Sequence, residues 1–358
     1  MRDVARKIGV SVSAVSLALK NSPKISPERR SEIISQAEEM GYRRDPRVTE
    51  LMAHLRAPRS RRTASKIAII VPELTRKLLA DYPPIQGLLA GAEQIAAVAG
   101  FGIDTFYPDD PGMSLRRVRS IILARGIKGV IIAPCRSGVA RLDFDCSDLC
   151  VATAGYSIEE PRISRACPNY LQMMDELIAT CVAKKYKRIG LVMTYNEGGI
   201  GHKLFTSSFL FYQSKIPPES RIPILAKSMI SKESVSDWFA AYRPDVIISA
   251  GSVYEILRSI KLRVPQDVAF ASIDVSEPPV DAFGANHRYD LVGHEALKQV
   301  LTLLNLNATG VPEHPKVVLV DSHYQDGFTL RKDDGTYRRR RPTPSKRPTI
   351  PSFRGFLD

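Results

Sequence analysis

The first 55 residues constrain the fold most, because their apolar side chains recur at helical spacing in three short segments. Residues 3–8 predict a first helix, and Gly9 suits the tight turn that ends it. Ser11 is placed to cap a second helix over 12–19, and Ser26 and Pro27 to start a third that runs to Met40. Three apolar stripes are expected to meet in one small core: Val4, Ala5 and Ile8; Val15 and Leu19; Ile33, Ala37 and Met40.

Two helices joined by a glycine turn, with a third completing the core, form the helix-turn-helix arrangement. Its second helix enters the major groove of DNA. On spacing alone, a plain three-helix bundle also accounts for this pattern. In the helix-turn-helix reading, the outward residues of the second helix are Val12, Ser13, Ser16, Leu17 and Lys20.

The distribution of charge favours a polyanionic partner. Of the net charge of +13, residues 1–66 carry +8 and residues 331–358 carry +6, whereas the stretch between them carries −1. General solubility does not explain an excess confined to the two ends, whereas contact with nucleic acid does.

The blocks DVA, GVS, AVSLAL, KISPERRSEII and GYRRDP, in this order and spacing, resemble the DNA-binding head of the lac repressor family of bacterial regulators. The resemblance implies that Val12, Ser13 and Leu17 read bases. It also implies that phosphates meet Ser11, Ser16, Lys24 and Ser26. Leu51 matches the family's hinge leucine, which enters the minor groove at the operator's centre. The neighbouring Met52 is also counted as a DNA-binding residue.

Three departures from the family pattern leave the operator sequence open. Leu17 stands where an arginine is common, which replaces a guanine contact with an apolar contact to a thymine methyl. Lys20 replaces a frequent asparagine. The chain also starts at Met1-Arg2, a few residues shorter than usual, so the first helix lacks the usual preceding cap; either Asp3 caps it or the true start lies upstream.

Residues 1–46 are therefore predicted to form the head, and residues 47–65 a hinge helix and linker. The segment 47–55 has helical spacing but is too short to be stable alone. We expect it to become ordered when it pairs with its copy on a second subunit and lies on DNA. The arginines of 57–65 fit a solvated tether or phosphate contacts equally well.

From residue 66 the pattern changes to alternating strands and helices. The run 67–71 is continuously apolar, as in a strand buried on both faces of a parallel sheet. Two such α/β units follow one another and resemble the two-lobed periplasmic-binding-protein fold that carries this family's effector domain. The predicted lobes are 66–158 with 288–315, and 159–287 with 316–331; the Arg- and Pro-rich tail 332–358 is expected to be disordered, with a DNA-contacting arm as its alternative.

In open α/β sheets small molecules bind beyond the carboxyl ends of the strands, here between the lobes. Three tyrosines just past predicted strands are candidates to stack on a ring: Tyr82, Tyr107 and Tyr156. The resemblance adds Lys203, Asp274 and His287 as effector contacts. These residue types suit a sugar-like effector, but Ala250 and Gly251 stand where the family has an Asn-Asp pair, which puts an ordinary sugar in doubt.

Little supports an enzyme. The chain has no Walker A motif, no GxGxxG after the first strand and no HExxH, so neither a cofactor nor a metal is predicted. The run 198–201 either cradles an anion or shapes a turn. With no long apolar run, no signal-like start and five cysteines lacking a CxxC pair, we expect a cytoplasmic protein with reduced thiols and no membrane contact.

The sequence therefore predicts a homodimeric transcription regulator, with repression the favoured sense, that binds double-stranded operator DNA under the control of a small molecule. The alternative is a small-molecule binding or transport receptor without DNA regulation. The basic head and the missing signal segment oppose that alternative.

Overall fold

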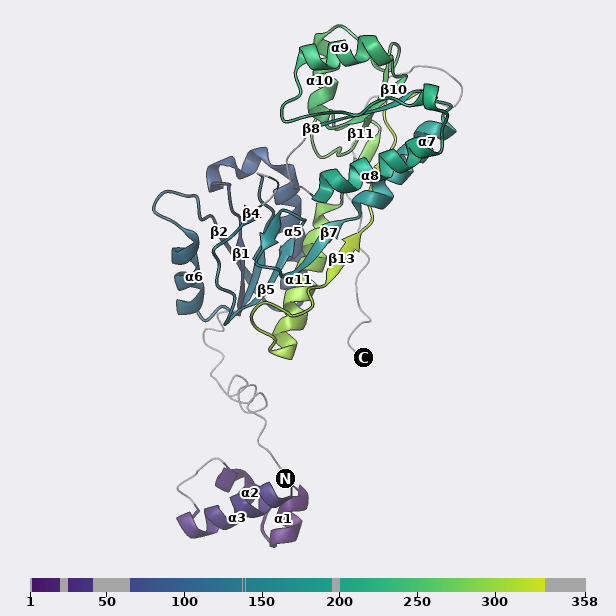
Figure 1. Ribbon diagram of the computed structural model, residues 1–358. Helices are drawn as coiled ribbons and strands as arrows, with labels where there is room; N and C mark the ends of the chain where they lie inside the picture. The colour runs from purple at the N-terminus through teal and green to yellow at the C-terminus, as the bar shows by residue number, and fades with distance from the viewer. Residues whose placement is uncertain are drawn as a thin grey trace. The chain divides into compact units, whose positions relative to one another are not determined.

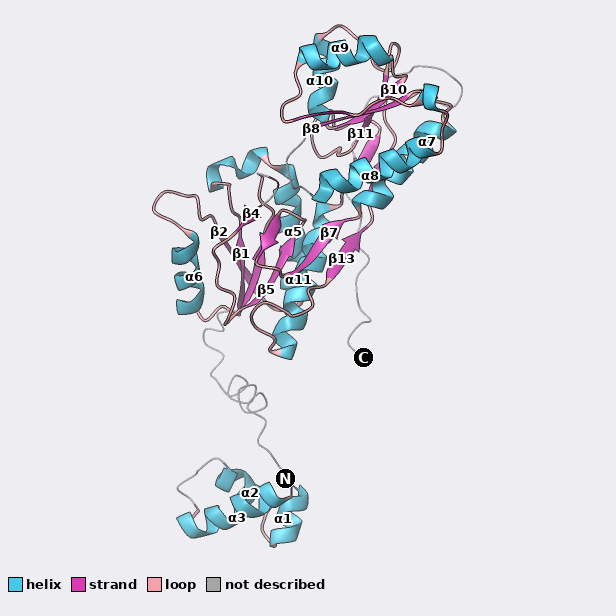
Figure 2. Cartoon of the chain, in the orientation of Figure 1, coloured by secondary structure: helices cyan, strands magenta, loops and turns pink. Residues whose placement is uncertain are grey.

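The computed structural model describes residues 2–19, 25–40, 65–136, 138, 140–194 and 200–331. The chain divides into two compact units, Met1–Thr63 and Ala64–Asp358, which are described one at a time. The first is a small helical head, and the second is an α/β unit built on two six-stranded sheets (Figures 1 and 2). The predicted fold class, an all-α head with a two-lobed α/β domain, is confirmed.

The head contains the helices α1 (Arg2–Ile8), α2 (Val12–Leu19) and α3 (Pro27–Glu39). Gly9 has a φ of 68°, a left-handed conformation that glycine adopts without strain, and it ends α1 as expected. The backbone N–H of Ala14 donates to Ser11 Oγ at 3.1 Å, and that of Arg29 to Ser26 Oγ at 3.3 Å, so both predicted caps are present.

The core of the head is small. Its fully or nearly fully buried side chains are Ala5, Val15, Ala18, Ile33 and Ala37. The prediction for Met40 was wrong: α3 ends one residue before it, and its side chain is 37% exposed. Val4 and Leu19, also predicted for the core, have side chains outside the described part of the chain.

The first lobe is built on a parallel sheet with the strand order β13-β7-β5-β3-β1-β2. Its strands are β1 (Lys66–Ile70), β2 (Gly102–Phe106), β3 (Gly129–Ile132), β5 (Cys150–Ala154), β7 (Ser164–Pro168) and β13 (Val317–Val320), and its helices are α5 (Pro83–Val98), α6 (Leu115–Ala124) and α11 (Tyr289–Leu306). Alternate residues of β1 face opposite sides: Ile67 and Ile69 pack against α5 and α11, whereas Ile70 packs against α6. Burial on both faces explains the unbroken apolar run in the sequence.

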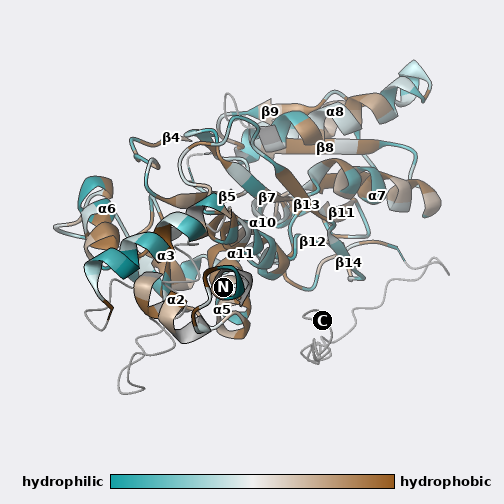
Figure 3. Ribbon diagram, turned by 90° about the horizontal axis from the view of Figure 1, so that it is seen from below, coloured by the Kyte–Doolittle hydropathy of each residue, from teal (hydrophilic) through white to brown (hydrophobic). Residues whose placement is uncertain are grey.

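The second lobe is built on a similar sheet with the strand order β14-β12-β11-β10-β8-β9, in which the edge strand β14 is antiparallel and the other strands are parallel. Its strands are β8 (Ile189–Thr194), β9 (Leu225–Lys227), β10 (Val246–Ser249), β11 (Ala269–Ser272), β12 (Gly284–Asn286) and β14 (His323–Gln325), and its helices are α7 (Tyr170–Ala183), α8 (Ile200–Ser214), α9 (Lys232–Tyr242) and α10 (Gly251–Ser259). Leu191 faces α7 and α8, while Val192 beside it faces α9 and α10. Figure 3 shows β8 in hydrophobic colour, while α6 and α8 alternate between hydrophobic and hydrophilic residues.

Short elements complete the unit. A pair of strands, β4 (Ala140–Arg141) and β6 (Ile158–Glu160), forms a separate small sheet in the first lobe. A 3-10 helix, η1 (Arg76–Asp81), leads into α5, and another, η2 (Pro218–Ser220), precedes β9. None of the described helices has both the length and the apolar character that crossing a bilayer requires.

The predicted lobe boundaries need correction. Strand β7 pairs with β5 and β13 pairs with β7, so the residues 164–168 and 317–320 belong to the first lobe rather than the second. The strand β7 escapes a sequence search because Ser-Arg-Ala-Cys-Pro is neither a continuous apolar run nor a clean alternation. The connections between the lobes consequently lie after β7, after β12 and after β13.

Candidate small-molecule site and nucleic-acid interface

The three connections between the lobes lie side by side. The backbone N–H of Asn169, just past β7, donates to the carbonyl of Val320, and its side-chain amide donates to Asp321 Oδ1 at 2.9 Å. His287, just past β12, has its Nδ1 3.4 Å from Ser322 Oγ. Residues far apart in the sequence therefore lie close together at the connections between the two lobes.

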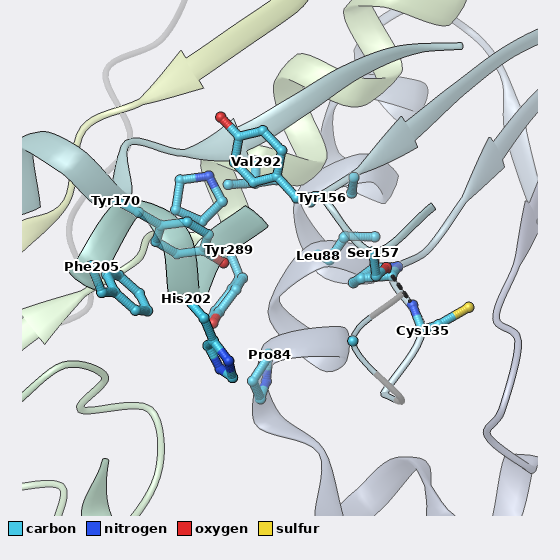
Figure 4. A pocket seen from close by; sticks show the side chains of 16 residues that line it. Pro84, Leu88, Cys135, Tyr156, Ser157, Tyr170, His202, Phe205, Tyr289 and Val292 are labelled. Carbon is cyan, nitrogen blue, oxygen red and sulfur yellow. Dashed lines mark hydrogen bonds between the residues drawn. The ribbon is translucent and has the colours of Figure 1, made fainter. Parts of the chain in front are cut away.

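A cavity of about 270 Å³ lies at this convergence. The first lobe contributes the loops after β3 and β5 together with the starts of α5 and α11, and the second lobe contributes the start of α7 and the first two turns of α8. Figure 4 shows the rings of Tyr170, Phe205 and His202 on one side, with Leu88, Ser157 and Cys135 opposite them. A ligand in this cavity would contact both lobes at once.

Tyr170 organises the aromatic wall. It is the first residue of α7, and the Asn169 side chain before it caps that helix by accepting from the backbone N–H of Gln172. Its ring centroid lies 4.9 Å from that of Phe205, at an interplanar angle of 65°, and 5.9 Å from that of Tyr156. Such edge-to-face and tilted contacts are favourable for aromatic quadrupoles and hold the rings in place. Burial raises the pKa of the Tyr170 hydroxyl, so it stays protonated at neutral pH.

A polar cluster lies just outside the lining. The hydroxyl of Tyr289, the first residue of α11, donates to Asp274 Oδ2 at 2.8 Å. His287 is 3% exposed, and its Nε2 lies 3.9 Å from the same carboxylate oxygen. Burial lowers the pKa of His287, although the nearby Asp274 charge partly opposes this shift. The imidazole is therefore neutral at pH 7, and Tyr289 stands between the carboxylate and the cavity.

Of the six effector contacts predicted from the sequence, the structure places Tyr156 in the lining of the cavity. Asp274 and His287 lie one layer outside, against Tyr289 and Tyr170. Lys203 is exposed on α8, outside the lining.

The other two tyrosines are used differently. Tyr82 precedes α5, with the Arg136 guanidinium 4.3 Å from its ring centroid. Tyr107 is 5% exposed and packs in the first lobe's core. Sequence reasoning missed Tyr170, His202, Phe205 and Tyr289. Tyr170 and Tyr289 each begin a helix just after a strand that the sequence pattern did not reveal, β7 because it mixes polar with apolar residues and β12 because it has only three residues.

The structure explains why Gly251 stands where the family has the second residue of an Asn-Asp pair. Gly251 is the first residue of α10, and a Cβ added to it would overlap the carbonyl oxygen of Pro278. Because that oxygen belongs to the backbone, no side chain fits at this position unless the loop that follows β11 moves. The second lobe therefore cannot present a side chain at position 251.

Replacing His287 with glutamine is expected to flatten the pH dependence of stability. The pKa of the folded His287 is depressed below the unfolded value of about 6.5, so below that pH the unfolded chain binds more protons. Above about pH 6.5 His287 is neutral in both the folded and the unfolded chain, so its burial carries no penalty for loss of charge. As the pH falls, the unfolded chain takes up a proton that the folded chain does not, and the free energy of unfolding decreases. Urea denaturation at pH 7.5 and 5.5 should show a larger loss for the wild type than for His287→Gln. His314→Gln, at a side chain that is 90% exposed, controls for the substitution itself. Equal losses in wild type and His287→Gln would contradict the assignment.

Metal and thiol chemistry have little basis in this unit. Among the described residues, no three or more His, Cys, Asp and Glu side chains are grouped closely enough to hold a metal ion. The cysteines are free and buried, and burial raises the pKa of Cys135 in the cavity wall to about 12, which keeps it a thiol.

In the head, helix α2 lies where the sequence places the recognition helix. Ser11 and Ser26 act as caps, and Leu17 is partly buried. The side chains of Val12, Ser13 and Ser16 are outside the described part of the chain, as are the residues Lys20, Lys24, Leu51 and Met52. Their assignment to DNA contacts stays a prediction.

Comparison with known proteins agrees with both units. Residues 1–45 match the model of the family described as bacterial regulatory proteins, lacI family. No curated protein gives a significant match.

Solved structures share the fold at low identity. The transcriptional regulator CelR–cellobiose complex is 17% identical, with a TM-score of 0.54, and the match covers 90% of this chain and 97% of that one. The lac repressor dimer bound to operator and the anti-inducer ONPF is 16% identical, with a TM-score of 0.54 and coverage of 91% and 97%. A lacI-family regulator from Rhizobium etli is 14% identical, with a TM-score of 0.57 and coverage of 74% and 99%.

Proposed function

We propose that this chain, whose first 45 residues belong to the lacI family of bacterial regulatory proteins, is a transcription regulator whose affinity for operator DNA is set by a small molecule held between its two lobes. The observation that carries the proposal is the combination of a family-type DNA-binding head with a cavity lined by both lobes. Either feature alone fits several kinds of protein, whereas together they couple DNA binding to a ligand site. We place the protein in the cytoplasm, where operator DNA is found.

On the DNA side, α2 is proposed to lie in the major groove with Val12, Ser13 and Leu17 toward base edges. Ser11, Ser16, Lys20, Lys24 and Ser26 are proposed to face the phosphate backbone and groove edge, and Leu51 with Met52 to enter the minor groove. Two heads are needed to read a near-palindromic site, so the proposed active form is a homodimer. The similar lac repressor structure is a dimer on its operator, which supports this arrangement.

On the ligand side, binding is proposed to shift the equilibrium between two arrangements of the lobes. The ligand contacts Tyr156 of the first lobe and Tyr170 of the second, so it favours the arrangement in which both contacts are made. The connections between the lobes are hydrogen-bonded to one another. A change at the cavity is therefore proposed to move the two lobes relative to each other as rigid bodies. A sugar-like effector stays a prediction from the sequence. The similar CelR structure is a complex with cellobiose, and the choice of effector in this chain depends on the lining of its own cavity.

The proposal is tested by fluorescence-anisotropy titration of the full chain with its own upstream DNA and with a scrambled duplex, each at two salt concentrations. We expect a preference of about 10³ for the upstream DNA that survives added salt, since base readout does not depend on counterion release. Leu51→Ala should lower affinity for the upstream DNA far more than affinity for the scrambled duplex. Equal, steeply salt-dependent binding to the upstream DNA, the scrambled duplex and fragments from the rest of the genome would refute the proposal.

A receptor that binds a small molecule without regulating DNA is the second candidate, because the two-lobed unit with its cavity would serve it equally well. It gives no role to the lacI-family head. The same titration separates the two, since a receptor has no preference among DNA sequences.

A further inference from the structure

The described lining of the cavity contains no Asp, Glu, Lys or Arg side chain. Its ring-bearing members are Tyr156, Tyr170, His202, Phe205 and Tyr289, together with Pro84, Pro134 and Pro168. A charged ligand moved from water onto this surface would lose its hydration without gaining an opposite charge. This chemistry favours an uncharged ligand.

Some polar atoms of the lining already bond within the protein. Ser157 Oγ accepts from the backbone N–H of Cys135 at 2.8 Å, and the Tyr289 hydroxyl donates to Asp274 at 2.8 Å. His202 is kept neutral because burial lowers its pKa, and the Tyr156 hydroxyl lies beside the thiol of Cys167. A sugar needs a hydrogen-bond partner for each hydroxyl that it buries, so the bonds that Ser157 and Tyr289 make within the protein reduce what the lining offers it.

The positions from which further polar groups would reach a sugar are withdrawn from the cavity. Lys203 points to solvent from α8 and is not part of the lining. Gly251 cannot carry a side chain because the carbonyl of Pro278 fills the space. The carboxylate of Asp274 is held by Tyr289 one layer outside.

What the cavity does offer is ring faces and edges from both lobes at a volume of about 270 Å³. This volume is just below the range of about 300–1,000 Å³ for ligand sites, and it suits one or two rings rather than an oligosaccharide. We propose that the ligand is an uncharged, planar aromatic molecule of one or two rings, held between Tyr156 with Leu88 on the first lobe and Tyr170 with Phe205 on the second. This inference rests on the proposed function only in taking the cavity as the effector site.

The test uses small probes and the full chain, with binding measured by isothermal titration calorimetry. Indole and phenol are the uncharged rings, benzoate is the matched anionic ring, and glucose is an uncharged polyol of similar size. Indole and phenol should bind, benzoate at least about tenfold more weakly than phenol because its charge has no partner, and glucose not measurably. Binding of glucose or benzoate as tight as that of phenol, or no binding of either uncharged ring, would overturn the proposal.

Two substitutions of Tyr156 test whether indole binds to the face of its ring or to its hydroxyl. Tyr156→Phe keeps the face and should retain indole affinity within about twofold, whereas Tyr156→Ala should lower it about tenfold. The ligand-free melting temperature of each variant shows whether it is folded, so a loss of binding in an unfolded variant is recognised. If Phe and Ala lowered indole affinity equally in folded protein, the hydroxyl rather than the face would be responsible, and the proposal would fall.

The operator titration repeated with indole present separates this proposal from the proposed function. If indole binds and also changes operator affinity, the ligand class stands. If indole binds without changing it, the ligand class still stands and the effector role is lost. If glucose alone binds and changes operator affinity, the regulator stands and the ligand class falls.

Discussion

Ile33→Ala is expected to lower operator affinity about 100-fold while leaving the two-lobed unit folded. Ile33 is fully buried at the centre of a core of five small or medium side chains. Truncating it leaves a cavity that costs about 2–5 kcal/mol, which is comparable to the whole stability of so small a domain. If each head is then folded about one-tenth of the time, and an operator must engage two heads, the apparent affinity falls about 100-fold.

The neighbouring residue offers a matched control. Ile34 is on the same helix and undergoes the same change in Ile34→Ala, but its side chain is only partly buried. We expect operator affinity within about threefold of wild type, since partly exposed positions cost little. Indole binding by calorimetry should be the same in wild type, Ile33→Ala and Ile34→Ala, because the cavity lies in the other unit. Equal operator affinity for the two variants would show that the core of the head is not organised around Ile33.

The fold was predictable where burial leaves a strong pattern. Strands buried on both faces show it as a continuous apolar run, as in 67–71, and the caps at Ser11 and Ser26 mark helix starts directly. The strand β7 was missed because it mixes polar with apolar residues, and β12 and β14 because they have only three residues each. They lie next to the connections between the lobes, so the same omission displaced the lobe boundaries.

The cavity was less predictable for the same reason. Tyr170 and Tyr289 reach it because each follows one of the missed strands and starts a helix, and no local pattern marks them as ligand contacts. Tyr107 shows the opposite error: it follows a correctly predicted strand, but its ring is taken up by the core. Position after a strand thus selects the right edge of the sheet but not the direction in which a side chain points.

The cavity also depends on how closely α5 and α11 approach each other. Leu88 of α5 and Val292 of α11 both line it, so the spacing of the two helices sets its shape. The approach is made possible by two glycines. A Cβ on Gly91 would overlap the Asp290 carbonyl, and one on Gly293 would overlap the Leu88 carbonyl. In both cases the obstacle is backbone, which cannot move aside without separating the helices.

Gly91→Ala is therefore expected to destabilise the two-lobed unit by about 2–3 kcal/mol, the upper part of the range for overpacking. Intrinsic helix propensity predicts the opposite sign, a gain of about 1 kcal/mol for alanine over glycine within a helix. The steric term should win because α5 would have to shift along its length to relieve one overlap. Urea denaturation of the full chain, followed by the fluorescence of Trp238 and by circular dichroism, measures the change.

Gly87→Ala supplies the control on the same helix, one turn earlier. Its new Cβ would stand 3.2 Å from the Cβ of Tyr289, a close contact that a shift of a few tenths of an ångström relieves. Here propensity and crowding nearly cancel, and we expect stability within about 1 kcal/mol of wild type. Indole affinity should fall in Gly91→Ala more than in Gly87→Ala, because only the first change moves Leu88 away from Val292. A Gly91→Ala protein as stable as Gly87→Ala would mean that the helices can separate at little cost, and that the cavity is not fixed by their contact.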